Sequence, residues 1–313
     1  MGRSKFPFLL LILIALSIPA YADNLPIPGG TFAINWHSDF NQQEQQKILD
    51  WLLHAAHSAS LIDGRFPRQN TNIIIRRHAR GTGPVPWANT IRHSSPEGVN
   101  FYVNPQVSLA GFTEDWTAVH EFSHLYIPYV GSGDIWISEG FASYYQNILM
   151  ARAGTLSVEQ MWQKLADGFR RGANDSNRNI KLGTLSADMR QNRAFMRVYW
   201  SGALYFLEMN IALQNSGQSL DAVISEFRMC CRSVDQHWNG IKLAKSFDRV
   251  AGTSIFATAY KDYESDRNFR GYTQLLSQLG IELDGNKVVF TQDEQQVLLR
   301  SRIVNPGYVR SRK

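Results

Sequence analysis

The sequence has few cysteines, little excess charge and no long apolar run beyond its N-terminus. Its only two cysteines, Cys230 and Cys231, are adjacent, and neighbouring Cα atoms about 3.8 Å apart are closer than most disulfides allow. We therefore expect two free buried thiols rather than a strained bridge, and a fold without a disulfide framework. The net charge is only +5 and no basic cluster of binding size is present, which argues against a nucleic-acid partner.

The first 22 residues have the pattern of a secretory signal peptide. Arg3 and Lys5 precede an apolar stretch over residues 6–20, and Ala20-Tyr21-Ala22 supplies small residues at a cleavage site. The apolar stretch is shorter than the roughly 20 residues that span a bilayer. We expect removal of residues 1–22, a secreted or periplasmic protein, and no stable membrane anchor after cleavage.

Hydrophobic spacing predicts an α+β chain with an N-terminal sheet part and a helical remainder. The sequence of 313 residues is 44% hydrophobic, which is ample for a sizeable core. Spacing predicts a helix over 41–61, strands over 72–76 and 99–103, and an irregular loop over 80–96 rich in glycine and proline. Further helices are expected over 113–127, 137–151, 157–170, 196–213, 219–230, 240–250 and 271–279. We divide the chain into an N-terminal α/β part (23–112), a helical part (113–285) and a basic C-terminal tail (286–313).

The most informative motif is His120-Glu121-Phe122-Ser123-His124. Residues four apart lie on one face of a helix, so both imidazoles can point at a single ion while Glu121 lies beside it. Zinc prefers nitrogen and carboxylate ligands and in catalytic sites leaves a position for water. Glu121 is placed to accept a proton from that water.

A third ligand candidate follows fifteen residues after His124. Glu139 lies in the helix expected over 137–151, and residues 128–134 before it include Gly131 and Gly133, which favour a turn. A helix, a reversal and a second helix would return Glu139 to the first helix. The two histidines and this glutamate would then form a complete catalytic zinc set.

These motifs resemble the gluzincin metallopeptidases. HEFSH followed by WISEGFASYY is similar to the HExxH and (N/S)EGFxSY helices of that group. The closest branches are the glycyl aminopeptidase-like family, often PDZ-associated, and the zinc aminopeptidases related to leukotriene A4 hydrolase. The resemblance implies a thermolysin-like zincin domain with one Zn²⁺ per chain. It also implies that His120, His124 and Glu139 hold the metal and that Glu121 acts as general base and acid.

The resemblance extends to a tyrosine downstream. Tyr199-Trp200-Ser201-Gly202-Ala203 is similar to the Y-x-(K/R)-G-A stretch of these families, although Ser201 stands where they usually have Lys or Arg. In the families this tyrosine donates to the oxyanion of the tetrahedral intermediate, so the resemblance implies that role for Tyr199. Its alternative is a core tyrosine in an aromatic helix.

One family feature is missing from the sequence. The aminopeptidases carry a G-x-M-E-N type motif before HExxH, whose glutamate binds the substrate amine, and residues 96–102 contain no such motif. Glu97 could substitute, but we favour a surface position for it. The predicted strand over 99–103 could serve as the edge that pairs with an extended peptide. The missing motif favours an endopeptidase over an aminopeptidase.

Several other polar residues receive weaker assignments. We interpret His54 and His57 as surface histidines, because no carboxylate accompanies them. Asp134 could orient a ligand histidine or a loop amide, with ordinary turn chemistry as the alternative. Ser143 and Gln146 follow Glu139 at helical spacing and are candidates for support of the metal ligands.

The sequence therefore predicts a secreted zinc peptidase, weakly favoured as an endopeptidase, that acts on peptides or proteins. One alternative is an aminopeptidase of the same family. Another is a non-catalytic module that binds peptide or protein and uses zinc for stability or not at all. A third keeps the zinc chemistry on another substrate, such as cell-wall peptide, an ester or an epoxide.

Overall fold

The N-terminal part of the protein is a five-stranded mixed sheet. The computed structural model describes residues 22–78, 83–175, 179–232 and 237–305. The predicted signal peptide therefore lies outside the described residues, apart from Ala22. The strands are β1 (Ala22–Ile27), β2 (Gly30–Trp36), β3 (Asn70–Arg77), β4 (Trp87–Ile91) and β5 (Gly98–Val103), in the order β1-β2-β3-β5-β4. The outer pairs are antiparallel, and β2, β3 and β5 run parallel.

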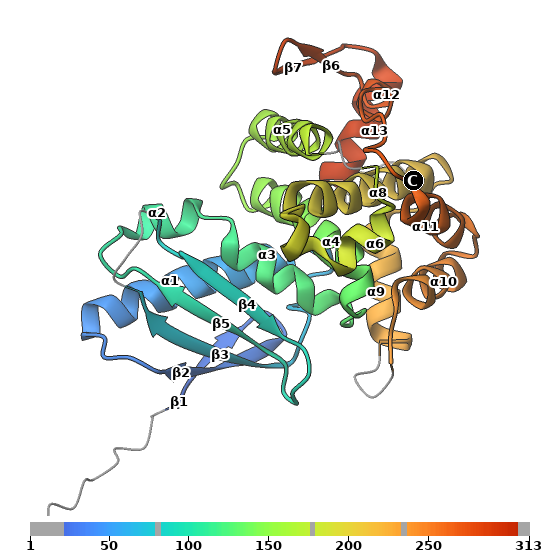
Figure 1. Ribbon diagram of the computed structural model, residues 1–313. Helices are drawn as coiled ribbons and strands as arrows, with labels where there is room; N and C mark the ends of the chain where they lie inside the picture. Colours follow the sequence, from blue (N-terminus) through green and yellow to red (C-terminus); the bar gives the residue numbers. More distant parts are fainter. Residues whose placement is uncertain (1–21, 79–82, 176–178, 233–236, 306–313) are drawn as a thin grey trace, which may run out of the picture.

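The sheet is covered on one face by α1 (Gln42–Ala59) and α3 (Thr117–Ser123) (Figure 1). The helix α1 begins with a reciprocal capping box between Asn41 and Glu44, which satisfies two backbone donors of the first turn. Aromatic rings join the layers: Phe101 of β5 contacts Trp51 of α1 and Phe122 of α3 at centroid distances of 5.1 and 5.8 Å. The motif helix is thereby attached to the sheet.

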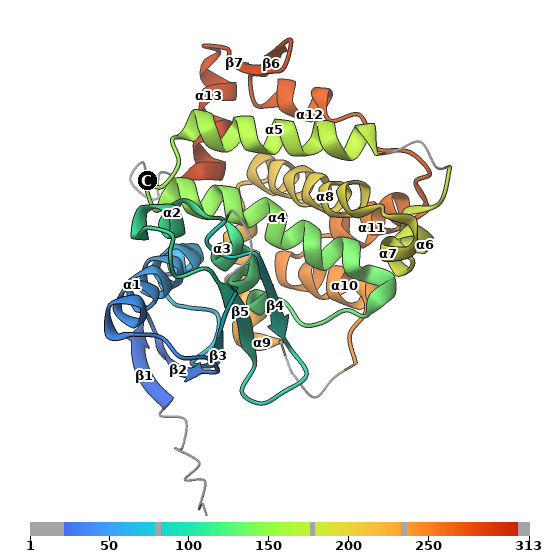
Figure 2. The same cartoon turned by 60° about the vertical axis from the view of Figure 1, so that its left-hand side comes forward.

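The rest of the chain is mostly helical, and its three longest helices, α4, α5 and α8, lie side by side (Figure 2). Among the described residues, no helix combines the length and hydropathy that a membrane crossing requires. The helices are α2 (Leu109–Glu114), α4 (Ile135–Arg152), α5 (Val158–Asn174), α6 (Leu182–Ala187), α7 (Met189–Asn192), α8 (Phe195–Asn215), α9 (Leu220–Cys230), α10 (Gly240–Ala251), α11 (Ile255–Ser265), α12 (Thr273–Gln278) and α13 (Glu294–Val304). The described chain also contains three short 3₁₀ turns, η1 (Ser60–Ile62), η2 (His124–Tyr126) and η3 (Ser132–Asp134). A hairpin joins β6 (Ile281–Asp284) to β7 (Lys287–Phe290).

The helices α4 and α8 cross in backbone contact. A Cβ atom at Gly202 would lie 1.8 Å from the carbonyl oxygen of Trp136, and one at Gly140 would lie 2.2 Å from the Cα of Gly202. Only glycine allows backbones to approach so closely. The crossing places Glu139, which precedes Gly140 on α4, near Tyr199, which lies one turn before Gly202 on α8.

The α+β prediction is confirmed, but three local expectations are wrong. The expected loop over 80–96 contains β4, because residues 87–91 find a partner in β5. The expected basic tail over 286–313 contains β7 and α13 up to residue 304, and the guanidinium of Arg300 donates to the carbonyl of Leu279, whereas residues 306–313 of that tail lie outside the described residues. Cys230 and Cys231 are disulfide-bonded and not buried.

Candidate metal centre and cleft

The three predicted ligands converge from two helices. His120 lies on α3, His124 opens the 3₁₀ turn η2 directly after it, and Glu139 lies on α4. Their ligand atoms all lie within 4.8 Å of one another. The Nε2 atoms of His120 and His124 lie 3.2 and 3.5 Å from Oε2 of Glu139. The glycine-containing reversal before α4 returns Glu139 to the histidines.

The outer nitrogen of each imidazole has its own partner. Nδ1 of His120 lies 2.7 Å from Oε1 of Gln146, and Nδ1 of His124 lies 3.2 Å from Oγ of Ser138. Such partners orient imidazole rings and direct the other nitrogen at a metal. Two imidazole nitrogens and one carboxylate oxygen aimed at one point are a donor set that fits Zn²⁺. The role of these residues as zinc ligands stays a prediction.

Burial and mutual contact set the charges of this cluster. Burial acts to raise the pKa of Glu139, but His124 and His120 outweigh it and hold that pKa well below its usual value. Burial acts to lower the pKa of His120, but Glu139 and Glu121 raise it overall, whereas burial prevails at His124 and lowers its pKa. A carboxylate held in its ionised form is the state that a metal ligand requires.

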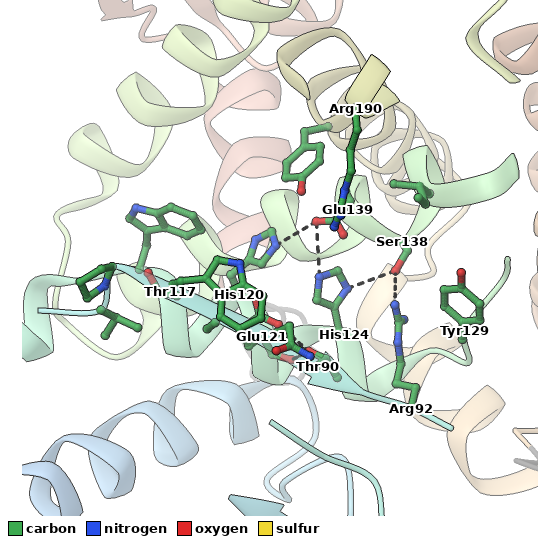
Figure 3. Close-up of a pocket in the computed structure, with 18 residues that line it drawn as sticks. Thr90, Arg92, Thr117, His120, Glu121, His124, Tyr129, Ser138, Glu139 and Arg190 are labelled. Atoms are coloured by element: carbon green, nitrogen blue, oxygen red, sulfur yellow. Dashed lines mark hydrogen bonds and ion pairs between the residues drawn. The ribbon is translucent and has the colours of Figure 1, made fainter. Parts of the chain in front are cut away.

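Glu121 lies beside the cluster and faces the same cavity (Figure 3). Its Oε2 accepts a hydrogen bond of 2.6 Å from the hydroxyl of Thr90 on β4. This contact ties the candidate base to the strand that lines the cavity. The second carboxylate oxygen has no hydrogen-bond partner among the described residues and is available to a water molecule.

The cavity has a volume of about 480 Å³ and is bordered by β4, α3, α4 and α8. β4 is an outer strand, since it pairs with β5 alone, whereas β5 lies between β3 and β4. The prediction that residues 99–103 form the exposed edge is therefore wrong. The edge strand along the cleft is β4, which was not predicted because the glycine-rich sequence around it favours a loop.

Tyr199 of α8 lines this cavity. Its ring lies nearly parallel to that of His120, at 14° and a centroid distance of 6.3 Å. Burial raises the pKa of the Tyr199 phenol well above its usual value, and the carboxylates of Glu139 and Glu121 raise it further. The phenol is thus held protonated and can donate. Its catalytic role stays a prediction.

Among the polar residues that line the cavity, the sequence did not indicate Ser138, Thr90, Arg92 or Arg190. Ser138 and Thr90 contact His124 and Glu121 respectively, and Nη2 of Arg92 donates to Oγ of Ser138 at 2.9 Å. Arg190 of α7 reaches toward Glu139 from the opposite wall (Figure 3). Ser138 could have been found from its place beside Glu139, but the others lie far from the motifs.

Glu97 does not lie on the surface as expected. It is 5% exposed and forms ion pairs with Arg68 and with Arg232, the latter at 2.9 Å. Two arginines converge on this carboxylate, which directly precedes β5, so Glu97 has a structural role. It is also absent from the residues that line the cleft, which removes it as a substitute for the missing amine-binding glutamate.

The remaining sequence candidates have structural partners. Asp134 accepts from the backbone amide of Gly240 at 2.7 Å and from the hydroxyl of Tyr260 at 2.6 Å, so it anchors α10 and α11 rather than a ligand histidine. Nε2 of His54 lies 3.0 Å from Oγ1 of Thr155, and His57 is exposed. Of the two supporting candidates on α4, Gln146 contacts a ligand histidine, whereas Ser143 lines a neighbouring pocket.

Comparisons with known proteins agree with this architecture. The profile of the M61 glycyl aminopeptidase family matches residues 126–204, a stretch that includes Glu139 and Tyr199 and begins just after His124. Among curated proteins, no sequence matches significantly.

Solved structures with similar folds come from zinc aminopeptidases and their relatives. An aminopeptidase N family protein of Idiomarina loihiensis is 14% identical with a TM-score of 0.62, over 87% of this chain and 52% of that one. Yeast leukotriene A4 hydrolase in complex with bestatin is 13% identical with a TM-score of 0.54, over 82% of this chain and 42% of that one. A two-domain M1 zinc metallopeptidase bound to L-arginine is 12% identical with a TM-score of 0.50, over 80% of this chain and 52% of that one.

This chain spans about half the length of those structures, and at such low identity the likeness concerns the fold. The thermolysin-like zincin fold predicted from the motifs is confirmed. The matched family is a peptidase family, in agreement with the enzyme class that the motifs predicted. The resemblance to the gluzincin peptidases is thus confirmed in the fold and, in sequence, over residues 126–204.

Proposed function

We propose that this protein is a zinc-dependent peptidase that hydrolyses peptide bonds in the cleft beside β4. The observation that carries the proposal is the convergence of His120, His124 and Glu139 within 4.8 Å, with Glu121 on the same cavity. Zinc, when bound there, would acidify a water molecule and polarise the scissile carbonyl. These three side chains would hold it through the two Nε2 atoms and the carboxylate.

The chain's own residues would carry the proton transfers. Glu121, steadied by Thr90, would accept the proton of the attacking water and pass it to the leaving amine. The protonated phenol of Tyr199 would donate to the oxyanion, a contact typically worth a few kcal/mol in the transition state. The free edge of β4 would bind the substrate backbone by strand addition.

Within this class we propose an aminopeptidase rather than the endopeptidase that the sequence favoured. The matched family and the similar structures are aminopeptidases or their relatives, which supports this choice. The absent amine-binding motif remains the argument for the endopeptidase. Apart from Glu121 and Glu139, no acidic residue lines the described part of the cleft.

The test is a mass-spectrometric cleavage profile of zinc-loaded protein on paired peptides with free and acetylated N-termini. Stepwise loss of N-terminal residues from free peptides alone would support the aminopeptidase, and equal internal cleavage of both would contradict it. Glu121→Gln should keep the fold and zinc but lose at least a thousandfold in turnover, about 4 kcal/mol. Glu226→Gln, at an exposed position on α9, is the matched control and should cleave as the wild type does. Full activity of the Glu121→Gln protein would overturn the mechanism.

We also propose that the protein is exported, as its N-terminal pattern of charge, apolar run and small residues suggests. Cleavage after Ala22 would leave Asp23 as the first residue, within β1. N-terminal sequencing of the protein recovered from the exported fraction of an expressing cell tests this. A mature protein that begins at Met1 would contradict it.

A further inference from the structure

The carboxylates and guanidinium groups that line the cleft are equal in number. Among the described residues they are Glu121, Glu139, Arg92 and Arg190. Both carboxylates have tasks under the proposed function, one as base and one as ligand. The two guanidinium groups cancel them, so zinc held by neutral imidazoles would leave the cleft with an excess of two positive charges.

Arg190 is the cation that remains free to bind. It lies on α7, and its exposed side chain forms no hydrogen bond or ion pair with any residue that the structure describes. Figure 3 shows the side chain extending from its helix toward Glu139, across the cavity from Thr90 and Glu121. A guanidinium presents paired donors that match a carboxylate in bidentate geometry.

Arg92 adds to the positive field without being free itself. Its Nη2 donates to Ser138 at 2.9 Å, its guanidinium lies 5.4 Å from the centroid of the Tyr129 ring, and its Nη1 is buried without a hydrogen-bond partner. This arginine is thus built into the wall. Its charge favours an anion in the cleft, and the low dielectric of the wall strengthens the effect.

We propose that Arg190 is a specificity-determining residue that binds a substrate carboxylate close to the scissile bond. The inference rests on the proposed function, because it concerns the same cleft. The carboxylate could be the side chain of an aspartate or glutamate residue or the free C-terminus of a short peptide. Both present the same group to Arg190, and the experiment below separates them.

The test measures equilibrium binding to zinc-loaded Glu121→Gln protein, in which bound peptide is not consumed. One arm uses a set of fluorescent amidated hexapeptides with either glutamate or glutamine at each position in turn. The other uses neutral peptides of two to four residues with free or amidated C-termini. We expect binding about tenfold tighter for the carboxylate member in one arm, and that arm identifies the source. The preference should weaken as salt increases, because Arg190 is exposed.

Variants at Arg190 in the same background then identify the residue responsible. Arg190→Gln should bring the dissociation constants of the two members of each pair within about twofold of each other, whereas Arg190→Lys should keep most of the preference for the carboxylate member. Arg193→Gln is the matched control, since Arg193 is exposed, follows α7 directly and does not line the cleft. It should behave like the parent protein.

The outcomes separate this inference from the proposed function. Equal binding of both members in both arms, or a preference unchanged by Arg190→Gln, would overturn the inference even if the wild type cleaves peptides. A preference that disappears with Arg190→Gln would support it even if the wild type cleaved none of them, and would leave the proposed function as the part that failed.

Discussion

The hydrogen bond between His120 and Gln146 offers a direct test of how the metal site is supported. Gln146 lies on α4 two turns after Glu139, and its Oε1 lies 2.7 Å from Nδ1 of His120, with both side chains buried. Methionine would replace glutamine at similar volume but cannot accept this bond as well. The Gln146→Met protein would hold an imidazole N–H buried and unpaired, which costs about 1–3 kcal/mol.

That energy would appear mainly as lost zinc affinity. At 1.4 kcal/mol per factor of ten, the range corresponds to about 5- to 150-fold, and removal of such supporting partners typically weakens metal binding 10- to 100-fold. We therefore expect the zinc dissociation constant of Gln146→Met to rise about 10- to 100-fold, measured by competition with a chromophoric chelator. Gln46→Met, at an exposed position on α1, is the control. Wild-type zinc affinity in a folded Gln146→Met protein would refute this account of His120.

Three further predictions concern stability. Gly202→Ala should destabilise the fold by about 3 kcal/mol in thermal melts, because its Cβ would lie 1.8 Å from a backbone oxygen of α4. The control Gly271→Ala, where nothing lies within 4 Å of the added Cβ, should be nearly neutral. Equal melting temperatures of the two variants would contradict the close helix crossing. Glu97→Ala should cost about 3–5 kcal/mol in urea unfolding, because it leaves buried arginine charge unpaired; a loss below 1 kcal/mol would show the pair to be dispensable. The Arg77 guanidinium lowers the pKa of Glu44 below 4.5. The stability advantage of the wild type over Glu44→Gln should therefore be full above pH 4.5 and disappear as the pH falls through the folded-state pKa of Glu44. An advantage that grows on acidification would contradict this argument.

The sequence predicted the metal cluster because its spacing is set by local geometry. His120 and His124 are four residues apart around the end of one helix, and the fifteen residues to Glu139 are enough for one reversal. Such short-range relations can be derived from helical periodicity and turn residues alone. The thermolysin-like fold followed from the resemblance that the same motifs carry.

What could not be predicted depends on contacts between distant segments. Thr90 reaches Glu121 only because β4 pairs with β5 on the sheet edge, and the proline- and glycine-rich surroundings of β4 favour a loop locally. Glu97 is buried because Arg68 and Arg232, separated by 164 positions in the chain, converge on it. Neither partner carries a local signal, so sequence reasoning favoured the surface for that carboxylate.

The crossing of α4 and α8 gives a physical reason why two separate motifs mark one site. Glu139 directly precedes Gly140, and Tyr199 lies one turn before Gly202, which is the glycine that contacts Gly140 across the helices. Because this contact is backbone against backbone, it leaves little freedom in the separation of the carboxylate and the phenol. Any larger residue at either glycine would move the two groups apart together with their helices. The glycines of the two motifs therefore belong to the site as much as its polar residues do, since they hold the candidate ligand and the candidate oxyanion donor on the same cavity.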